Sequence, residues 1–317
     1  MTDAPNRNHW LIAAWPGMGN VAVIAAGYLI QKLGLRPIDE LPAGGHFDVQ
    51  AVEVKKGVIA TPTTARGVFY RSDQPLAAKS PMDLTVFGGD AQPTLGVFAY
   101  ANTLLDRARS MGVQRVVTFA SMASQLHPSQ DPRVFGAATS PELLDELRKL
   151  EVNLLEEGQI GGLNGVILGA AAQRGMAGVC LMGEIPFFAA AVPNPKAARA
   201  VLDAFCLLTG IEVDFEELTE HAKTIDEALL RMLEKMERAA AGEEGDEEEG
   251  EAEGEAPAGG GEGEKGLDTE TLQKIERLFE QAHKDRSRAM ALKKELDRLG
   301  VFKKYENRFL DLFKRAE

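Results

Sequence analysis

Cysteine, histidine and aromatic residues are scarce in this 317-residue chain, which has 2 Cys, 5 His and 6% Phe, Trp and Tyr. The five histidines stand apart from one another: His9, His46, His127, His221 and His283. Because no HExxH, no CxxC and no histidine pair at ligand spacing occurs, neither a metal site nor another cofactor is expected. The isolated Cys180 and Cys206 are interpreted as small core side chains of a protein in a reducing cytoplasm.

Long apolar runs and an excess of basic residues are also missing. No segment approaches the roughly 18 uncharged apolar residues of a membrane span, and the first ten residues contain no apolar signal core. The net charge is −13, yet residues 1–240 hold 27 acids and 21 bases, and residues 267–317 hold 10 acids and 13 bases. Neither part has the basic excess that duplex nucleic acid demands. We therefore expect a soluble cytoplasmic protein that binds neither nucleic acid nor membrane.

The acidity is concentrated in residues 241–266, which contain 11 acids, one Lys, many glycines and no apolar run. Such a segment cannot offset the entropy of folding, so it is expected to be a flexible linker. Apolar periodicity resumes after it at these positions: Leu272, Ile275, Phe279, Ala282, Ala289, Leu292, Leu296, Leu299, Phe302, Tyr305, Phe309 and Phe313. With a break at Gly300, this pattern indicates a helical hairpin with a coiled-coil seam. The predicted parts are an α/β domain (1–240), an acidic linker (241–266) and a helical hairpin (267–317).

The first α/β unit is a strand at 10–15, a glycine turn at 16–20 and a helix that ends at Gly34. Gly17 and Gly19 would allow backbone N–H groups at the helix start to hold an anion. The full dinucleotide fingerprint requires a third glycine, where this chain has Ala22. A tight turn that lets the helix meet the sheet is therefore favoured over a phosphate site.

Further strands and helices follow at intervals typical of an α/β protein. A meander of short strands is expected at 38–41, 49–54, 58–61 and 67–70, covering one sheet edge. Core strands are expected at 84–87 and 115–120, with a helix at 94–111 between them and a polar loop at 121–136 after them. Further helices are expected after the cap Ser140, at 196–209, and after the cap Asp214. In the last of these, an apolar stripe runs from Leu218 to Met236.

Residues 151–188 are interpreted as one βαβ unit: a strand at 152–156, a loop at 158–165, a helix at 166–174 and a buried strand at 179–182. A parallel pair joined in this way requires a right-handed crossover. The helix carries Gly169, Ala170, Ala171 and Ala172, whose small side chains allow close approach of a sheet or of a neighbouring subunit.

Glycines and small polar residues follow the core strands and would gather at one rim of the sheet, where open α/β sheets bind ligands. The candidate ligand-binding residues are Gly17, Gly19, Asn20, Asp90, Ser121, Asn164 and Glu184. No catalytic residue is assigned, because there is no GxSxG elbow and no phosphate-binding lysine, and only His127 lies near Ser121 in sequence. The rim is interpreted as a ligand cleft, as a contact surface or simply as turns.

Six motifs in order carry a family resemblance: PGMGNVA, FGGDAQP, PRVFGAAT, IGGLNGVIL, LMGEIPFF and NPKAARAVLDAFCLLTGIEVDFEEL. Over residues 10–238 the chain resembles the proteasome assembly chaperone family of archaea and bacteria. The resemblance implies a three-layer α/β/α fold similar to nucleoside phosphorylases, self-assembly into rings such as trimers, and binding of proteasome subunits.

Two functions of different class follow. One is a non-catalytic assembly chaperone or scaffold that forms a homo-oligomer, expected to be a trimer, and binds proteasome-type or other protein subunits. The other is a small-molecule enzyme, nucleoside phosphorylase-like or ligase-like, that uses the glycine-lined rim. A set of His, Glu and Lys at strand ends would favour the enzyme, and the sequence does not present one.

Overall fold

The computed structural model describes residues 8–42, 44–49, 52–61, 64–72, 76, 82–150, 152–241, 278–279 and 292. Its contacts divide the chain into two units, residues 1–245 and 246–317. In the second unit, Leu278, Phe279 and Leu292 are helical, and Phe279 and Leu292 are buried. The predicted acidic linker and the rest of the predicted helical hairpin lie outside the described residues. No helix among the described residues is both long and apolar enough to cross a membrane.

An eight-stranded mixed sheet is the centre of the first unit, in the order β2-β5-β6-β1-β7-β10-β8-β9. Its strands are β1 (Asn8–Ala14), β2 (Arg36–Leu41), β5 (Gly67–Arg71), β6 (Met82–Gly89), β7 (Arg115–Ser124), β8 (Val134–Ala138), β9 (Asn153–Leu154) and β10 (Ala177–Pro186). The four central strands, β6, β1, β7 and β10, are parallel neighbours. Their sequences are apolar because helices cover both faces of this part of the sheet.

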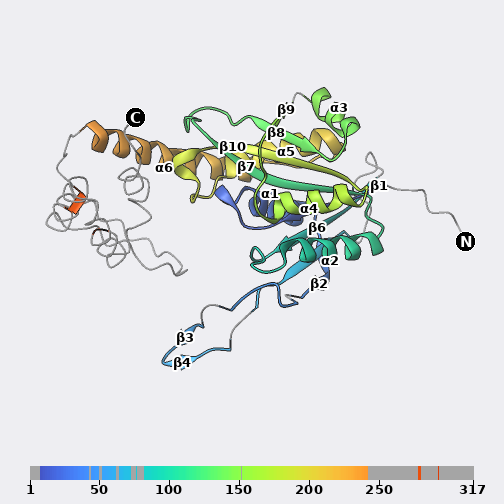
Figure 1. The fold of residues 1–317 in the computed structure, drawn as a ribbon. Helices are drawn as coiled ribbons and strands as arrows, with labels where there is room; N and C mark the ends of the chain where they lie inside the picture. Colours follow the sequence, from blue (N-terminus) through green and yellow to red (C-terminus); the bar gives the residue numbers. More distant parts are fainter. Residues whose placement is uncertain are drawn as a thin grey trace, which may run out of the picture. The chain divides into compact units, whose positions relative to one another are not determined.

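Helices lie on both sides of the sheet, as Figure 1 shows. They are α1 (Val21–Lys32), α2 (Val97–Ser110), α3 (Pro141–Lys149), α4 (Gly162–Gln173), α5 (Pro195–Thr209) and α6 (Glu216–Ala241). Successive residues of β1 point to opposite faces: Leu11 packs in the core with α2 and α4, whereas Ile12 packs in the core with α1, α3 and α5. Helix α6 packs on α5. The expected three-layer α/β/α arrangement is confirmed.

Helix ends follow the expected local chemistry. The Asn194 side chain accepts a hydrogen bond from Ala197 N (2.8 Å) at the start of α5, and Gly210, with φ +71°, ends that helix. Asp214 Oδ1 accepts from Glu216 N (3.0 Å) at the start of α6. Helix α2 begins later than predicted because Gly96 has φ +57°.

The predicted parallel βαβ unit is wrong. β9 pairs in parallel with β8, and β8 pairs antiparallel with β10, so β8 separates β9 from β10 and the two run in opposite directions. The expected loop at 121–136 is also wrong at both ends, because β7 continues to Ser124 and residues 134–136 belong to β8. Helix α4 begins four residues before the predicted start.

The expected meander divides into two pieces. β2 and β5 extend the main sheet at one edge, whereas β3 (Val54–Lys55) and β4 (Val58–Ile59) form a separate two-stranded ribbon that extends away from the sheet (Figure 1). Within the predicted strand at 49–54, residues 49, 52 and 53 are not in a strand. Val54 and Ile59 are opposite one another in the ribbon and are 59% and 69% exposed.

The apolar stripe of α6 is buried only in its first part. Leu218, Ala222 and Leu229 are buried, the first against the core that contains α5. Met232 and Met236, which continue the stripe, are exposed. The predicted amphipathic helix is present, and its apolar stripe is buried at Leu218, Ala222 and Leu229 and exposed at the two methionines.

Candidate binding cavity

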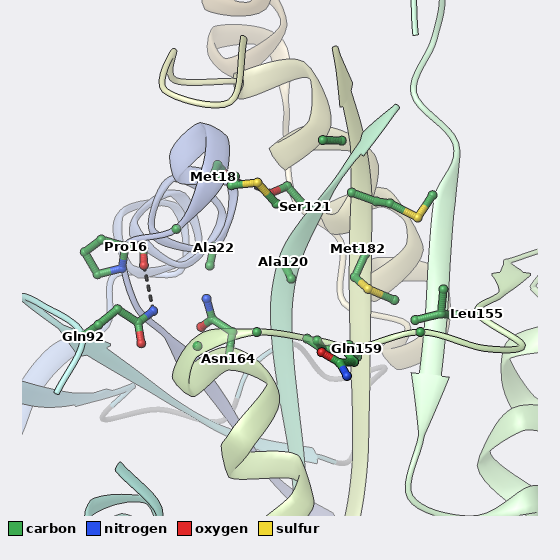
Figure 2. A pocket seen from close by; sticks show the side chains of 17 residues that line it. Pro16, Met18, Ala22, Gln92, Ala120, Ser121, Leu155, Gln159, Asn164 and Met182 are labelled. Atoms are coloured by element: carbon green, nitrogen blue, oxygen red, sulfur yellow. Dashed lines mark hydrogen bonds between the residues drawn. The ribbon is translucent and has the colours of Figure 1, made fainter. Parts of the chain in front are cut away.

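A cavity of about 620 Å³ lies at the carboxyl ends of β1, β7 and β10, where parallel sheets commonly bind ligands. The residues that line it are Pro16, Gly17, Met18, Ala22, Gln92, Ala120, Ser121, Met122, Ala123, Leu155, Gly158, Gln159, Ile160, Gly161, Gly162, Asn164 and Met182. Figure 2 shows Pro16 and Gln92 on one side, Leu155, Gln159 and Met182 on the other, and Ala120 and Ala22 between them. Its volume is within the range of small-molecule and cofactor pockets, about 300 to 1,000 Å³.

Three side chains fix the walls of this cavity. Gln92 Nε2 donates to the carbonyl oxygen of Pro16 (2.8 Å; dashed in Figure 2), and Gln92 Oε1 accepts from Leu163 N (2.8 Å). One amide from the β6–α2 turn therefore joins the loop after β1 to the first turn of α4. Asn164 Oδ1 accepts from Trp15 N (3.2 Å), and Ser121 Oγ donates to the carbonyl oxygen of Met18 (2.8 Å). These bonds hold the cavity in a preformed shape.

The lining contains no ionisable side chain among the described residues. Its apolar surface includes three methionines, Met18, Met122 and Met182, and its hydroxyl, on Ser121, is engaged with a backbone carbonyl. A nucleophile needs a neighbouring base, and general acid–base catalysis needs a group that titrates near the working pH. The described cavity supplies neither.

The structure brings together three of the seven candidate site residues. Gly17, Ser121 and Asn164 line the cavity. Gly19 and Asn20 belong to the adjacent 3-10 turn η1 (Met18–Asn20), and Gly19 has φ +63°. There Gly19 N donates to the carbonyl oxygen of Ala190 (2.7 Å), so the turn is joined to η2 (Phe187–Ala189) and its flank.

The two acidic candidates do not line the cavity. Asp90 is exposed, and its Oδ2 accepts from Arg66 N (3.3 Å). Glu184, only 2% exposed, accepts from Arg133 Nη2 (2.7 Å) and Arg133 Nε (3.0 Å). The Arg133 guanidinium, with further hydrogen bonds from Ser124 and the Arg133 backbone, lowers the pKa of the Glu184 carboxyl to about 2 despite its burial. Glu184 is thus ionised at neutral pH and paired with Arg133.

Gln92 and the three methionines that line the cavity were not singled out from the sequence. Gln92 was visible only as part of a turn, and its two hydrogen bonds join segments 76 and 71 positions away. The methionines were missed because Met18, Met122 and Met182 have no common spacing. The one usable signal was the glycine-rich stretch before α4, which forms the wall from Gly158 to Gly162.

The remaining reactive groups of the described residues give no alternative centre. No cluster of three or more His, Cys, Asp and Glu side chains that could hold a metal ion is present among them. Burial raises the pKa of the Cys180 thiol to about 11 and that of Cys206 to about 12, so both thiols stay protonated at neutral pH.

Comparison with known proteins decides the family. The family model described as the PAC2 family matches residues 11–233. The chain belongs to the PAC2 family. The family resemblance drawn from the six sequence motifs is thereby confirmed. The match covers every residue that lines the cavity and all of the sheet and its helices except the first residues of β1 and the last residues of α6.

Among PAC2 proteins and solved structures, three similarities are informative. An uncharacterized protein of Methanocaldococcus jannaschii is 30% identical over 252 residues, which cover 77% of this chain and 92% of the relative. The crystal structure of Pyrococcus furiosus PbaB, an archaeal proteasome activator, is 30% identical with a TM-score of 0.61, covering 73% of this chain and 95% of PbaB. Pyrococcus furiosus PbaA, an archaeal homolog of proteasome-assembly chaperone, is 27% identical with a TM-score of 0.56, covering 74% and 92%.

Proposed function

We propose that this PAC2 protein is an assembly chaperone or scaffold that binds proteasome-type subunits and does no chemistry of its own. The observation that carries the proposal is the cavity: it lies where an α/β enzyme would place its active site, and its described lining has no ionisable side chain. Neither candidate carboxylate lines the cavity, and Glu184 is paired with Arg133. The similarity to PbaB and PbaA supports proteasome subunits as the partner class.

Exposed apolar side chains provide surfaces for such contacts. The β3–β4 ribbon extends away from the sheet (Figure 1). It presents the exposed side chains of Val54 and Ile59 on one of its faces and that of Val58 on the other. An isolated two-stranded ribbon is only marginally stable in water, so a partner that covers its apolar face would also order it. Apolar surface of this kind typically marks a protein contact.

We further propose that the protein is a homo-oligomer, a trimer, that uses the outer face of α4. Gly169 and Ala172 are exposed there, and a Cβ added at Gly169 would meet no atom within 4 Å. Ala170 and Ala171, by contrast, are buried within the chain. The small residues of α4 therefore serve two contacts, and only the outer pair is available to another subunit.

The test uses the full chain and the proteasome core subunits encoded by the same genome. Native mass spectrometry should detect a complex of the oligomer with those subunits. The core subunits should also assemble into rings faster when the oligomer is present. The Val54→Ser, Ile59→Ser double variant should weaken the complex, whereas the matched Thr219→Ser change, on α6 away from the ribbon, should not. Failure of the full chain to bind any core subunit, or turnover of nucleosides or of amino acids with ATP, would refute the proposal.

A further inference from the structure

The cavity is chemically suited to one class of occupant. A charged ligand would lose its hydration on entering and would meet no described ionisable side chain of opposite charge, which makes its burial costly. An apolar group has no such cost and gains contact with Leu155, Ile160 and the three lining methionines. The thioether side chains of Met18, Met122 and Met182 adapt to different apolar shapes, as at surfaces that bind varied peptides.

The wall on the α4 side offers backbone hydrogen bonds. The peptide groups of residues 157–159 form no backbone hydrogen bond to another described residue and are exposed to water, and Gly158 and Gln159 line the cavity. By contrast, the lining side chains Gln92, Asn164 and Ser121 are engaged within the chain. A ligand that supplies both an apolar side chain and backbone amides would replace the water on this wall with hydrogen bonds and cover the apolar surface at the same time.

The rim favours an extended occupant over a compact one. Met18 lines the cavity and is also 48% exposed, so the apolar surface continues out of the cavity onto η1. The bond from Gly19 N to Ala190 O joins η1 to the region of η2, where Phe187 is 54% exposed. A chain that continues beyond the cavity would cover this apolar surface.

We propose that the cavity receives an uncharged, apolar peptide segment of the bound partner protein, with an apolar side chain inserted among Met18, Met122 and Met182. The proposal rests on the protein-binding function above and specifies the chemistry of its contact. The uncharged lining disfavours peptides with charged side chains. The methionines allow apolar side chains of different shapes to bind.

Methyl NMR of the full chain with isotope-labelled methionine tests this directly. The probe is the acetylated, amidated peptide GSLFLSG, and GSEEESG is its charged counterpart. The apolar peptide should shift the methyl signals of Met18, Met122 and Met182 in a saturable way. The signals of Met232 and Met236, on the exposed part of α6, should stay in place. The charged peptide should bind at least about tenfold more weakly, a difference of about 1.4 kcal/mol.

A substitution that fills the cavity tests the proposal from the protein side. Ala123 lines the cavity and is exposed, so Ala123→Phe should occupy space without disturbing the buried core and should weaken peptide binding at least about tenfold. Ala99→Phe, at an exposed position outside the cavity, should leave binding unchanged. Unfolding midpoints of both variants would show that each is folded.

Several results would overturn the inference: no methionine shift with GSLFLSG, equal binding of the charged peptide, or unchanged binding by Ala123→Phe. If N-acetylleucinamide bound as tightly as GSLFLSG, the inference would also be overturned, because the cavity would then be a small-molecule site. If core subunits bind the chain but the peptide does not, the inference fails and the proposed function stands. If the peptide binds and the core subunits do not, the cavity chemistry is supported and the proposed partner is wrong.

Discussion

Replacing Arg133 with alanine should destabilise the first unit by roughly 3 kcal/mol at neutral pH. The side chain of Glu184 is only 2% exposed and accepts two hydrogen bonds from the Arg133 guanidinium. Its pKa is lowered from 4.5 to about 2, and one pKa unit corresponds to about 1.4 kcal/mol. Ser124 and the Arg133 backbone also lower this pKa and remain in the variant, so the shift gives an upper limit for the loss. That limit lies near the lower end, about 3 kcal/mol, of the cost of removing one partner from a buried ion pair. The lower end applies because the Arg133 side chain is 63% exposed to water.

The loss of stability in Arg133→Ala should depend on pH. A carboxyl whose folded pKa is lowered stabilises the fold above its unfolded value of 4.5, and this contribution is lost as the pH falls toward 2. In Arg133→Ala the buried carboxyl has no guanidinium partner, so protonation relieves the cost. The difference between the wild type and the variant should therefore be largest near pH 7 and should shrink below pH 4.5.

Urea unfolding at pH 7 and pH 3 measures this difference. Tryptophan fluorescence reports on the first unit, because both tryptophans of the chain, Trp10 and Trp15, belong to it. Arg148→Ala is the control: its pair with Asp145 is more than half exposed on both sides and should contribute less than about 1 kcal/mol. A loss below about 1 kcal/mol in Arg133→Ala, or an equal loss at both pH values, would refute the role assigned to this pair.

Other expectations concern α4, α5 and the chain beyond α6. Gly169→Leu should dissociate the oligomer, seen by light scattering, without loss of fold stability; an intact trimer would contradict the α4 interface. Ala171→Leu should instead lower fold stability by about 1 to 3 kcal/mol, because Ala171 is fully buried in its own chain. Asn194→Ala should lower the free energy of unfolding by about 1 kcal/mol through loss of the cap to Ala197 N, and an unchanged unfolding midpoint would argue against that cap. Limited proteolysis should cut first between residues 240 and 265, and earlier nicking within the α/β domain would place the domain boundary elsewhere.

Local sequence signals were sufficient for the four central strands and for the starts of α5 and α6. The strands β1, β6, β7 and β10 are apolar runs because both faces of the sheet are covered, and this property is visible in sequence. The caps at Asn194 and Asp214 depend on residues two or three positions away. Features of this kind are determined within a single segment.

Features that depend on distant partners could not be predicted in the same way. β8 lies in a stretch of mixed polarity and becomes a strand by pairing with β10, about 40 positions later. Its insertion beside β10 also displaces β9 to the edge, which no pattern in 151–188 indicates. Glu184 comes just after the apolar run 179–182 and lies within β10, where Arg133, 51 positions earlier, pairs with it. Residue type and strand position alone do not distinguish an available carboxylate from a paired one.

The place of β1 in the sheet has a consequence for synthesis of the chain. β1 leaves the ribosome before both of its neighbours in the sheet, β6 and β7, which end at Gly89 and Ser124. At about 5 to 20 residues per second, the second neighbour emerges roughly 5 to 20 seconds after β1. During this interval the nascent chain carries an apolar strand with both edges unpaired, the kind of segment that pairs with other chains. Aggregation is therefore a greater hazard while the chain is being made than after it has folded.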